Sequence, residues 1–391
     1  MIDVLNILLV EDSAVDADLL VLFLRKEKIN FTYLRVWTKD SFVEALELNN
    51  YDIIIADHSL PQFTGMDAFR LLKSKKQKSG IPFILVTGTV PENILTQYAK
   101  EGLDDYILKD NLLRLPSAID NLLNKKKIEL LHRKLEIAHR EIKDSIDCAK
   151  RIQNSILPDK TLLSKIAPDS FILFKPKDTV SGDFYFFRKD EKSSLLAVAD
   201  CTGHGVPGAM MSMIGIEKIN YLFRRTKDPC DILKKLNKRM RTALSTVDHE
   251  SSEGMDVALC NIDTENNILK FSGANRPLWI IRKGETEIEE ILGTKNAIGY
   301  RFTNNLNPDY ECHEKKLNAG DTFYIFSDGF ADQFGGERKK KITTRRFKQI
   351  LLSIQDKTMD QQGQYLNDFV EKWKGDDEQI DDILVIGIRQ N

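Results

Sequence analysis

The chain has 391 residues, of which 42% are hydrophobic and 30% are charged, a composition typical of folded globular proteins rather than of disordered chains. At about 150 residues per domain, this length predicts two or three domains. The formal net charge of −2 excludes a global excess of positive charge that would attract nucleic acid or anionic lipid.

The cellular compartment is predicted from the apolar runs and the cysteines. No uncharged apolar run approaches the ~18 residues that cross a bilayer, and Asp3 stands where a secretory signal carries lysine or arginine. The cysteines form no CxxC pair; they are Cys148, Cys201, Cys230, Cys260 and Cys312. We therefore expect a cytoplasmic protein with no membrane partner, whose cysteines are unpaired thiols.

Residues 1–124 predict an α/β domain with a doubly wound parallel sheet. Stretches of helical periodicity alternate with apolar runs at 7–10, 33–36 (the weakest), 51–56, 82–86 and 105–108. Near-continuous apolar runs are typical of parallel strands that helices cover on both faces. Ligands of such sheets bind at the carboxyl ends of the strands.

Polar residues gather at that edge of the predicted sheet. Glu11 and Asp12 follow the first strand and Asp57 closes the third, so three carboxylates repel one another unless a hard divalent cation such as Mg²⁺ binds them. Thr87 and Lys109 end the fourth and fifth strands, where a hydroxyl and an ammonium group can hold phosphoryl oxygens. The alternative is that these acids are merely solvated or cap the next helix.

Residues 1–124 resemble the receiver domain of response regulators, with a flavodoxin-like fold, through "IIIADHSLP", "ILVTGT" and "DDYILKD". The resemblance implies that Asp57 is the phosphoacceptor and that an upstream sensor histidine kinase is a partner. It also implies roles for other residues: Mg²⁺ ligands in Glu11, Asp12, Asp57 and the backbone carbonyl of Ser59, phosphate contacts from Thr87 and Lys109, and a switch aromatic in Tyr106.

Residues 125–158 predict a coiled-coil linker helix. The segment is rich in charge and lacks glycine and proline before Pro158; its apolar residues lie three and four apart, at Ile128, Leu131, Leu135, Ala138 and Ile142. Such spacing favours a parallel homodimer. At Ile146 the apolar stripe moves by one position, which predicts a local change in supercoil. A solvated spacer helix that packs on one domain remains the alternative.

Residues 171–391 predict an α+β domain with largely antiparallel sheets, because strands and helices come in blocks rather than in strict alternation. The expected strands are 195–199, 257–262, 268–272, 278–281, 322–326 and 383–388. The expected helical stretches are 208–225, 230–246 and 344–373.

Four aspartates of this region lie in motifs that contain glycine, and each adjoins a strand-like run. They are Asp183 in "VSGDFYFF", Asp200 in "VADCTGHGVPGA", Asp328 in "IFSDGFADQFGG" and Asp381 in "EQIDDILVIG". Glycine turns allow backbone to come close to an ion, and carboxylates that converge in one cleft need metal. Two Mn²⁺ or Mg²⁺ ions would activate a water for attack on a phosphate ester. Taken singly, each acid could instead be a surface residue.

Residues 171–391 resemble the SpoIIE-type branch of the metal-dependent PPM serine/threonine phosphatases, whose fold is a β-sandwich flanked by helices. The resemblance implies that the two ions are bound by Asp183, Asp200, the backbone carbonyl of Cys201, Asp328 and Asp381. Asp382, which follows directly, could be an acid that contacts the metal ligands without binding metal itself, because the family pattern points to Asp381 as the ligand of the pair. Asn275 in "GANRP" is interpreted as a turn residue.

The combined prediction is a two-component output enzyme. Phosphorylation of Asp57 would control a phosphatase that acts on serine or threonine of a partner, such as a phosphorylated STAS-domain anti-sigma factor antagonist. The alternative is a non-catalytic scaffold that binds its partner when phosphorylated, against which the retained acids argue.

A basic run from 338 to 341, followed by Arg345 and Arg346, offers a second polar feature. It could hold nucleic acid or the phosphate of a protein substrate, but a charge run is usually a solvated face. Because aromatic residues do not interleave with it, we predict no nucleic-acid partner.

Overall fold

The computed structural model describes residues 4–88, 92–190, 193–244, 253–300 and 308–391. The chain divides into two compact units, Met1–Glu141 and Ile142–Asn391, each with its own hydrophobic cores. Among the described residues, no helix combines the length and the apolar character that a membrane crossing requires.

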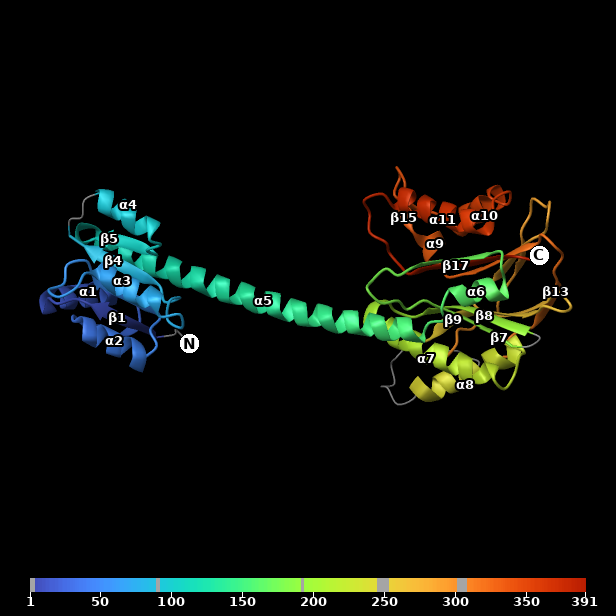
Figure 1. Ribbon diagram of the computed structural model, residues 1–391, viewed down its shortest axis with the longest axis horizontal. Helices are drawn as coiled ribbons and strands as arrows, with labels where there is room; N and C mark the ends of the chain where they lie inside the picture. Colours follow the sequence, from blue (N-terminus) through green and yellow to red (C-terminus); the bar gives the residue numbers. More distant parts are fainter. Residues whose placement is uncertain (1–3, 89–91, 191–192, 245–252, 301–307) are drawn as a thin grey trace. The chain divides into compact units, whose positions relative to one another are not determined.

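The first unit is a five-stranded parallel sheet with helices on both faces (Figure 1). Its strand order, β2-β1-β3-β4-β5, is that of flavodoxin-like folds, as the sequence predicts. The strands are β1 Leu5–Val10, β2 Phe31–Val36, β3 Ile53–Asp57, β4 Phe83–Thr87 and β5 Asp105–Leu108. The helices are α1 Ala14–Lys26, α2 Lys39–Leu48, α3 Gly65–Ser74, α4 Glu92–Lys100, the 3-10 turn Lys109–Arg114 and the start of α5 Leu115–Ile156.

Alternation along the strands produces the two cores of this unit. Ile7 and Leu9 of β1 pack with α1 and with the first turns of α5, whereas Leu8 and Val10 pack with α2 and α3. Successive side chains of a strand point to opposite faces, so an uninterrupted apolar strand serves both layers. The sheet edge where the strands end is thus left for polar residues.

The second unit is a sandwich of two antiparallel sheets, β13-β10-β9-β8-β7 and β12-β11-β14-β17-β6. Their strands are β6 Ser170–Lys175, β7 Phe184–Lys189, β8 Ser193–Cys201, β9 Met255–Asp263, β10 Ile268–Ala274, β11 Leu278–Ile281, β12 Glu289–Ile291, β13 His313–Lys316, β14 Thr322–Phe326 and β17 Ile383–Arg389. A short hairpin adds β15 Phe334–Gly335 and β16 Lys340–Lys341.

Helices cover both outer faces of the sandwich, which confirms the predicted fold class (Figure 1). They are α7 Gly205–Phe223, α8 Pro229–Leu244, α9 Gly329–Asp332, α10 Thr344–Ser353 and α11 Met359–Lys374. Helix α6 Thr161–Ile166 instead contributes Leu163 to the cluster between the sheets. The cluster between the sheets includes Val198, Phe323 and Leu384. The helices α7 and α8 pack on the first sheet, and α10 and α11 pack on the second.

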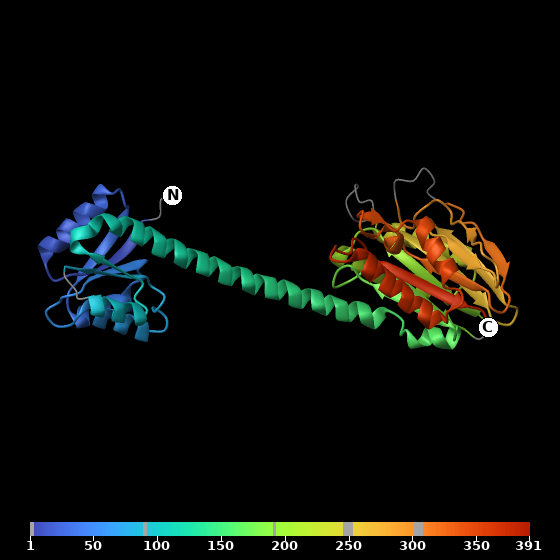
Figure 2. The same ribbon diagram turned by 90° about the horizontal axis from the view of Figure 1, so that it is seen from above.

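Helix α5 is continuous from Leu115 to Ile156 (Figures 1 and 2), so it begins before the predicted linker at residue 125. Its first turns bury Leu115 and Ile119 in a core of the first unit. Apolar side chains farther along stay exposed: Ile128 by 66%, Leu131 by 56%, Leu135 by 67% and Ile142 by 61%.

The predicted helix 344–373 is wrong as one element, because the structure contains α10 and α11 there. Helix α10 ends at Ile354, a buried residue whose N–H donates to the carbonyl of Leu351. Thr358 then starts α11 through a capping box with Gln361. A capping box satisfies N–H groups at a helix start and thus favours a new helix at that point.

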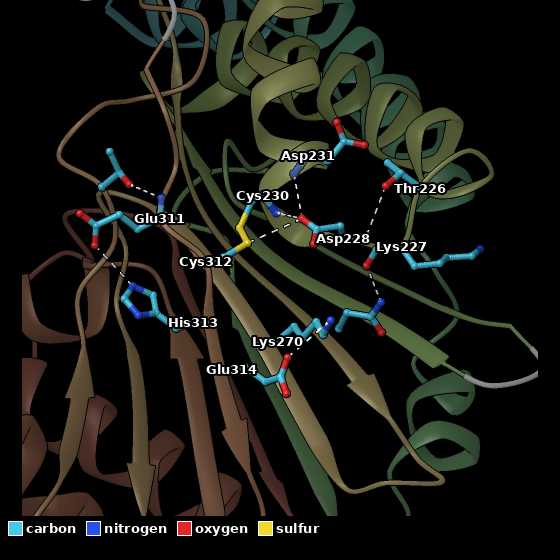
Figure 3. The surroundings of a disulfide bond; sticks show 12 residues. Thr226, Lys227, Asp228, Cys230, Asp231, Lys270, Glu311, Cys312, His313 and Glu314 are labelled. Atoms are coloured by element: carbon cyan, nitrogen blue, oxygen red, sulfur yellow. Dashed lines mark hydrogen bonds and ion pairs between the residues drawn. A yellow bond between two sulfur atoms is a disulfide. The ribbon is translucent and has the colours of Figure 1, made fainter.

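The prediction that all cysteines are unpaired is wrong for two of them. A disulfide joins Cys230, in the first turn of α8, to Cys312, directly before β13 (Figure 3). Their Cα atoms are 5.7 Å apart, a distance typical of disulfides. The two cysteines are 82 residues apart in sequence, so only the tertiary fold brings them together. Cys148, Cys201 and Cys260 are free.

We expect Cys230→Ser to lower the free energy of unfolding by about 2–4 kcal/mol, because the bond restricts a long loop of the unfolded chain. Urea denaturation without reductant measures the change. Reduction of the wild type with dithiothreitol should have the same effect, whereas Cys148→Ser, at an exposed free thiol, should not. Equal midpoints for wild type and Cys230→Ser would contradict the bond.

Candidate active site and phosphoacceptor site

Acidic residues converge at one end of the sandwich, where they line a cavity of about 260 Å³. The cavity is lined by Asp200, Cys201, Thr202, Gly203, His204, Asp256, Arg276, Asp328 and Asp381. Asp200 and Cys201 are the last residues of β8, Asp328 follows β14, and Asp381 precedes β17. The structure thus brings together three of the four predicted aspartates in one cavity, and the backbone of Cys201 with them.

The fourth, Asp183, lies directly before β7 and is 2% exposed. Its Oδ2 atom is buried without a hydrogen-bond partner among the described residues. Burial, and then the charge of Asp200, raise the pKa of Asp183 well above its usual range. A buried carboxylate oxygen without a donor is costly unless a proton or a cation accompanies it.

The other carboxyl groups of the cavity are also poorly solvated. Burial raises the pKa of Asp200 to about 8, although the guanidinium of Arg276 acts in the opposite direction. Burial likewise raises the pKa values of Asp256 and Asp381, and the charge of Asp328 adds to both. The cavity therefore favours bound protons or bound cations over a set of free carboxylates.

Asp382 has a different role from its neighbour Asp381. Its side chain accepts hydrogen bonds from the backbone N–H groups of Lys177 (2.7 Å), Gly182 (2.7 Å) and Asp183 (3.3 Å). These bonds fix the loop that presents Asp183 and occupy the Asp382 carboxylate. Asp381, which lines the cavity, is left as the candidate ligand of the pair.

Arg276 is a residue of this site that the sequence analysis missed. Its Nη2 donates to Asp328 (2.8 Å) and to Asp200, and Asp256 lies at 3.5 Å. Arg276 belongs to "GANRP", where only Asn275 was considered. Asn275 has φ +59° and donates to Asp256 at 2.7 Å, so it forms the predicted turn and also orients an acid.

Asp256, at the start of β9, was missed as well. It is the direct cross-strand neighbour of Asp200, so β8 and β9 together place two carboxylates side by side. An acid at the start of a strand in "GMDVALC" carries no recognisable pattern. Its position opposite Asp200 would have indicated a role at the site, but the register of two strands is not evident from sequence.

Glycines allow the segments of this site to approach closely. A Cβ on Gly182 would lie 2.6 Å from the carbonyl oxygen of Gly203 and 3.3 Å from that of Cys201. A Cβ on Gly329 would lie 2.0 Å from the carbonyl oxygen of Asp382. Larger residues at either position would separate the acids of β7, β8, β14 and β17.

The residues at this site fit divalent cations. The donors are carboxylates from four chain segments with a backbone carbonyl beside them, which suits Mg²⁺ or Mn²⁺ better than Zn²⁺. The orphaned Asp183 oxygen is the observation that most requires a cation. Arg276 now supplies positive charge to Asp200 and Asp328.

A second acidic cluster lies at the carboxyl edge of the parallel sheet of the first unit. Carboxylate oxygens of Glu11, Asp12 and Asp57 all lie within 4.8 Å of one another, as the sequence predicts for a magnesium site. Burial raises the pKa of Glu11. A hydrogen bond from the backbone N–H of Ser13 lowers this pKa and the charge of Asp57 raises it, and the net direction is upward. Arg35 donates to the carbonyl oxygens of Glu11 (2.9 Å) and Asp12 (2.7 Å) and so fixes this turn.

Lys109 reaches into this second acidic cluster. Its Nζ lies 3.0 Å from Asp57, 2.8 Å from Asp16 and 3.5 Å from Glu11. Burial lowers the pKa of the ammonium group, but these carboxylates outweigh it and raise the pKa above its usual range. Asp16, in the first turn of α1, is a partner that the sequence analysis did not include.

The remaining predicted residues of this site lie on β4 and β5 and in the segment after β3. Thr87 ends β4 and is buried, and Tyr106 lies half-buried on β5 against the core of α2 and α3. Ser59 lies two residues after Asp57 and forms a bridge with Thr64. A Cβ on Gly65 would lie 2.3 Å from the Asp57 carbonyl oxygen, so glycine allows α3 to start there.

The end of α5 is anchored beside Asp183. Gln153 is 3% exposed, and its side-chain amide donates to the carbonyl oxygen of Ser181 (2.6 Å) and to the hydroxyl of Ser212 (2.9 Å). Its carbonyl oxygen accepts the N–H of Ser181 at 3.2 Å. The linker helix therefore holds the backbone two residues before Asp183.

Family comparisons agree with this division of the chain. The family described as Stage II sporulation protein E (SpoIIE) matches residues 190–391, and the response regulator receiver domain family matches residues 7–120. These matches do not test the expected domain limits at residues 124, 158 and 171, which stay predictions.

Individual proteins match each part. The phosphoserine phosphatase RsbU of Bacillus subtilis is 30% identical over 203 residues, which are 51% of this chain and 57% of RsbU. The two-component response regulator ORR3 of rice is 31% identical over 31% of this chain and 88% of its own length. The solved SiaA-PP2C domain of Pseudomonas aeruginosa aligns with 65% of this chain and 99% of its own, at 36% identity and a TM-score of 0.59. The chain thus spans little more than half of RsbU.

We expect the metal-free protein to lose stability as pH rises, because the folded-state pKa of Asp183 lies above its unfolded value. The folded state then binds more protons than the unfolded state above about pH 4, so unfolding becomes easier from there toward pH 8. Asp183→Asn should weaken this dependence, to which Asp200, Asp256 and Asp381 also contribute, and should raise the unfolding free energy at pH 8.

Urea denaturation in EDTA at pH 5 and pH 8 measures this effect. Asp376→Asn, at an exposed aspartate after α11, is the matched control and should change neither value. An Asp183→Asn protein that is less stable than wild type at pH 8 would show that this carboxylate is held by a partner other than metal.

Proposed function

Because the chain belongs to the SpoIIE family and carries a receiver domain before the family's domain, we propose that it is a phosphorylation-regulated protein phosphatase. The observation that carries this proposal is the convergence of Asp183, Asp200, Asp328 and Asp381, with one buried oxygen that lacks a partner. A scaffold that only binds a partner would have no need for such a costly group.

In the proposed reaction, water attacks the phosphorus of a phosphoserine or phosphothreonine, and the side-chain oxygen of the substrate leaves. Asp183, Asp200, Asp328, Asp381 and the carbonyl of Cys201 would hold two Mn²⁺ or Mg²⁺ ions. Such ions activate water and screen the phosphate charge when bound. Arg276, which already contacts Asp328, lies where a guanidinium can hold a phosphate oxygen.

At the receiver, a carboxylate oxygen of Asp57 would attack the phosphodonor, whose leaving group departs with its bonding electrons. Glu11, Asp12 and the Ser59 carbonyl would hold Mg²⁺ with Asp57. Lys109, which already donates to Asp57, and Thr87 would hold the transferred oxygens. A sensor histidine kinase is the proposed source of the phosphoryl group in cells.

The proposed coupling runs through α5. Its first turns belong to the receiver core, and Gln153 near its end binds the backbone of Ser181. A rotation of this helix would therefore displace the loop that carries Asp183. The exposed stripe of Ile128, Leu131 and Leu135 supports a parallel homodimer through the same helix.

The proposed substrate is a phosphoprotein. RsbU is a phosphoserine phosphatase, and the two chains share 30% identity over 203 residues. A phosphorylated STAS-type anti-sigma factor antagonist is the candidate that the family resemblance suggests.

We expect Asp328→Asn to reduce turnover of p-nitrophenyl phosphate with Mn²⁺ at least about a hundredfold, because one carboxylate of the cation site is lost. Its fold should survive, since Asp328 is half-exposed at the start of α9. Far-ultraviolet circular dichroism and the thermal midpoint control for folding. Near-wild-type turnover at saturating Mn²⁺ would remove Asp328 from the site.

We expect acetyl phosphate to change the turnover of the wild type but not that of Asp57→Asn. This variant lacks the Asp57 carboxylate but keeps the acidic cavity, whose residues belong to the other unit. Gln153→Leu should also remove the response, because the helix no longer holds Ser181 by hydrogen bonds. Asn154→Leu, at the exposed neighbouring position, should keep it. Phosphorylation of the Gln153→Leu receiver, followed by mass spectrometry, separates lost coupling from lost phosphorylation.

A response to acetyl phosphate in Asp57→Asn would mean that control runs through another residue. A response retained in Gln153→Leu would mean that α5 acts through contacts other than this amide.

A further inference from the structure

The basic run at 338–346 forms one wall of a groove of about 680 Å³. The groove is lined by Gly335, Glu337, Arg338, Lys340, Lys341, Ile342, Thr343, Arg345, Arg346, Gln349 and Trp373. Five of these residues are cationic and a single one is acidic. The surface left for a ligand is therefore strongly positive.

Two of the cations are already engaged, and three are available. Lys341 pairs with Asp332 at 2.9 Å, and the guanidinium of Arg346 lies 4.1 Å from the ring centre of Trp373. Arg338, Lys340 and Arg345 are exposed, and in the part of the chain that the structure describes they make no ion pair. Such side chains can bind carboxylates without first breaking an existing pair.

The groove is built on the same framework as the acidic cavity. Asp328, which lines the cavity, is followed by the single turn of α9, and Asp332 at its end binds Lys341. At 1.5 Å per residue, this turn separates Asp328 from Asp332, the partner of Lys341, by about 6 Å along the axis.

A buried glutamine joins the two sites. Gln333 is fully buried, and its side chain binds the backbone of Glu378 (3.1 Å) and of Ile380 (3.3 Å), directly before Asp381. Its main-chain carbonyl accepts the N–H of Ile342 (3.0 Å) and the indole N–H of Trp373 (3.3 Å). The groove wall and the acidic cavity are thus held in one hydrogen-bonded unit.

We propose that this groove binds acidic residues of the phosphoprotein substrate on one side of its phosphorylated serine or threonine. The proposal rests on the phosphatase function and adds a substrate class to it. The acidic cavity would hold the phosphate through cations, while carboxylates of the flanking segment would pair with Arg338, Lys340 and Arg345. An extended peptide spans about 3.3 Å per residue, so a few residues bridge the helical turn between the two sites.

Nucleic acid fits the groove less well than an acidic peptide. Single-stranded nucleic acid is bound by aromatic faces on which bases stack. The aromatic ring that lines this groove, Trp373, already has the Arg346 guanidinium over one face. An acidic peptide requires only the exposed cations.

The test compares two synthetic phosphoserine peptides, one flanked by glutamates and the other by glutamines. The measured quantity is the ratio of their kcat/KM values with Mn²⁺ at low salt. We expect the wild type to favour the acidic peptide about tenfold, and the triple variant Arg338→Gln, Lys340→Gln, Arg345→Gln to lose that preference.

A matched control removes three charges from the other basic groove, between α7 and α8. The triple variant Lys218→Gln, Arg225→Gln, Lys238→Gln should keep the wild-type ratio. A wild-type ratio near one, or an equal loss in both triple variants, would overturn the proposal. Raising the salt concentration should reduce the preference in the wild type and in the control variant.

Two further measurements separate this proposal from its premise. If neither peptide nor p-nitrophenyl phosphate is hydrolysed, the phosphatase function fails, and the fluorescence anisotropy of labelled peptides still decides the docking. Weaker binding of the acidic peptide to the 338/340/345 variant than to wild type supports the groove. Tighter binding of a single-stranded oligonucleotide than of the acidic peptide would assign the groove to nucleic acid and overturn the proposal.

Discussion

Electrostatic repulsion among buried carboxylates is the constraint on which the second unit depends. Asp183, Asp200 and Asp381 are brought together by strands of two different sheets, so the sandwich cannot close without forcing these charges into a poorly solvated cavity. Arg276 offsets part of this cost in the metal-free protein through Asp200 and Asp328. Divalent cations would offset the rest. Stability and cation binding are thus linked through the same acids.

The sequence allowed prediction of those site residues that stand in local patterns. Asp183, Asp200, Asp328 and Asp381 each lie beside a glycine or at the edge of an apolar run, and the structure brings them to one end of the sandwich. Arg276 is different. It stands alone among apolar and turn residues, and its role depends on how β10, β8 and β14 are arranged across two sheets. A contact of this kind is decided by tertiary structure and leaves no periodicity in the chain.

The two units also differed in how far the sequence determined their elements. The parallel sheet arises from repeated strand and helix units, so strand order and edge residues could be predicted from local patterns. The antiparallel sandwich contains long-range pairings such as β6 with β17, and its edge strands β6, β7, β12 and β13 are absent from the expected strands. The Cys230–Cys312 bond belongs to the same class of long-range contact. Spacing in the chain could not have predicted it.

Two buried glutamines connect the acidic cavity to the rest of the molecule. Gln153 binds the backbone before Asp183 from the side of α5, and Gln333 binds the backbone before Asp381 from the side of the basic groove. A buried amide has both donors and an acceptor, so each can hold two backbone segments at fixed positions without adding charge to a crowded site. Control from the receiver and contact with the substrate would then reach different aspartates of one cavity. If these aspartates bind the same cations, as proposed, a displacement at one segment would change the affinity of the whole site for metal and, through metal, for phosphate.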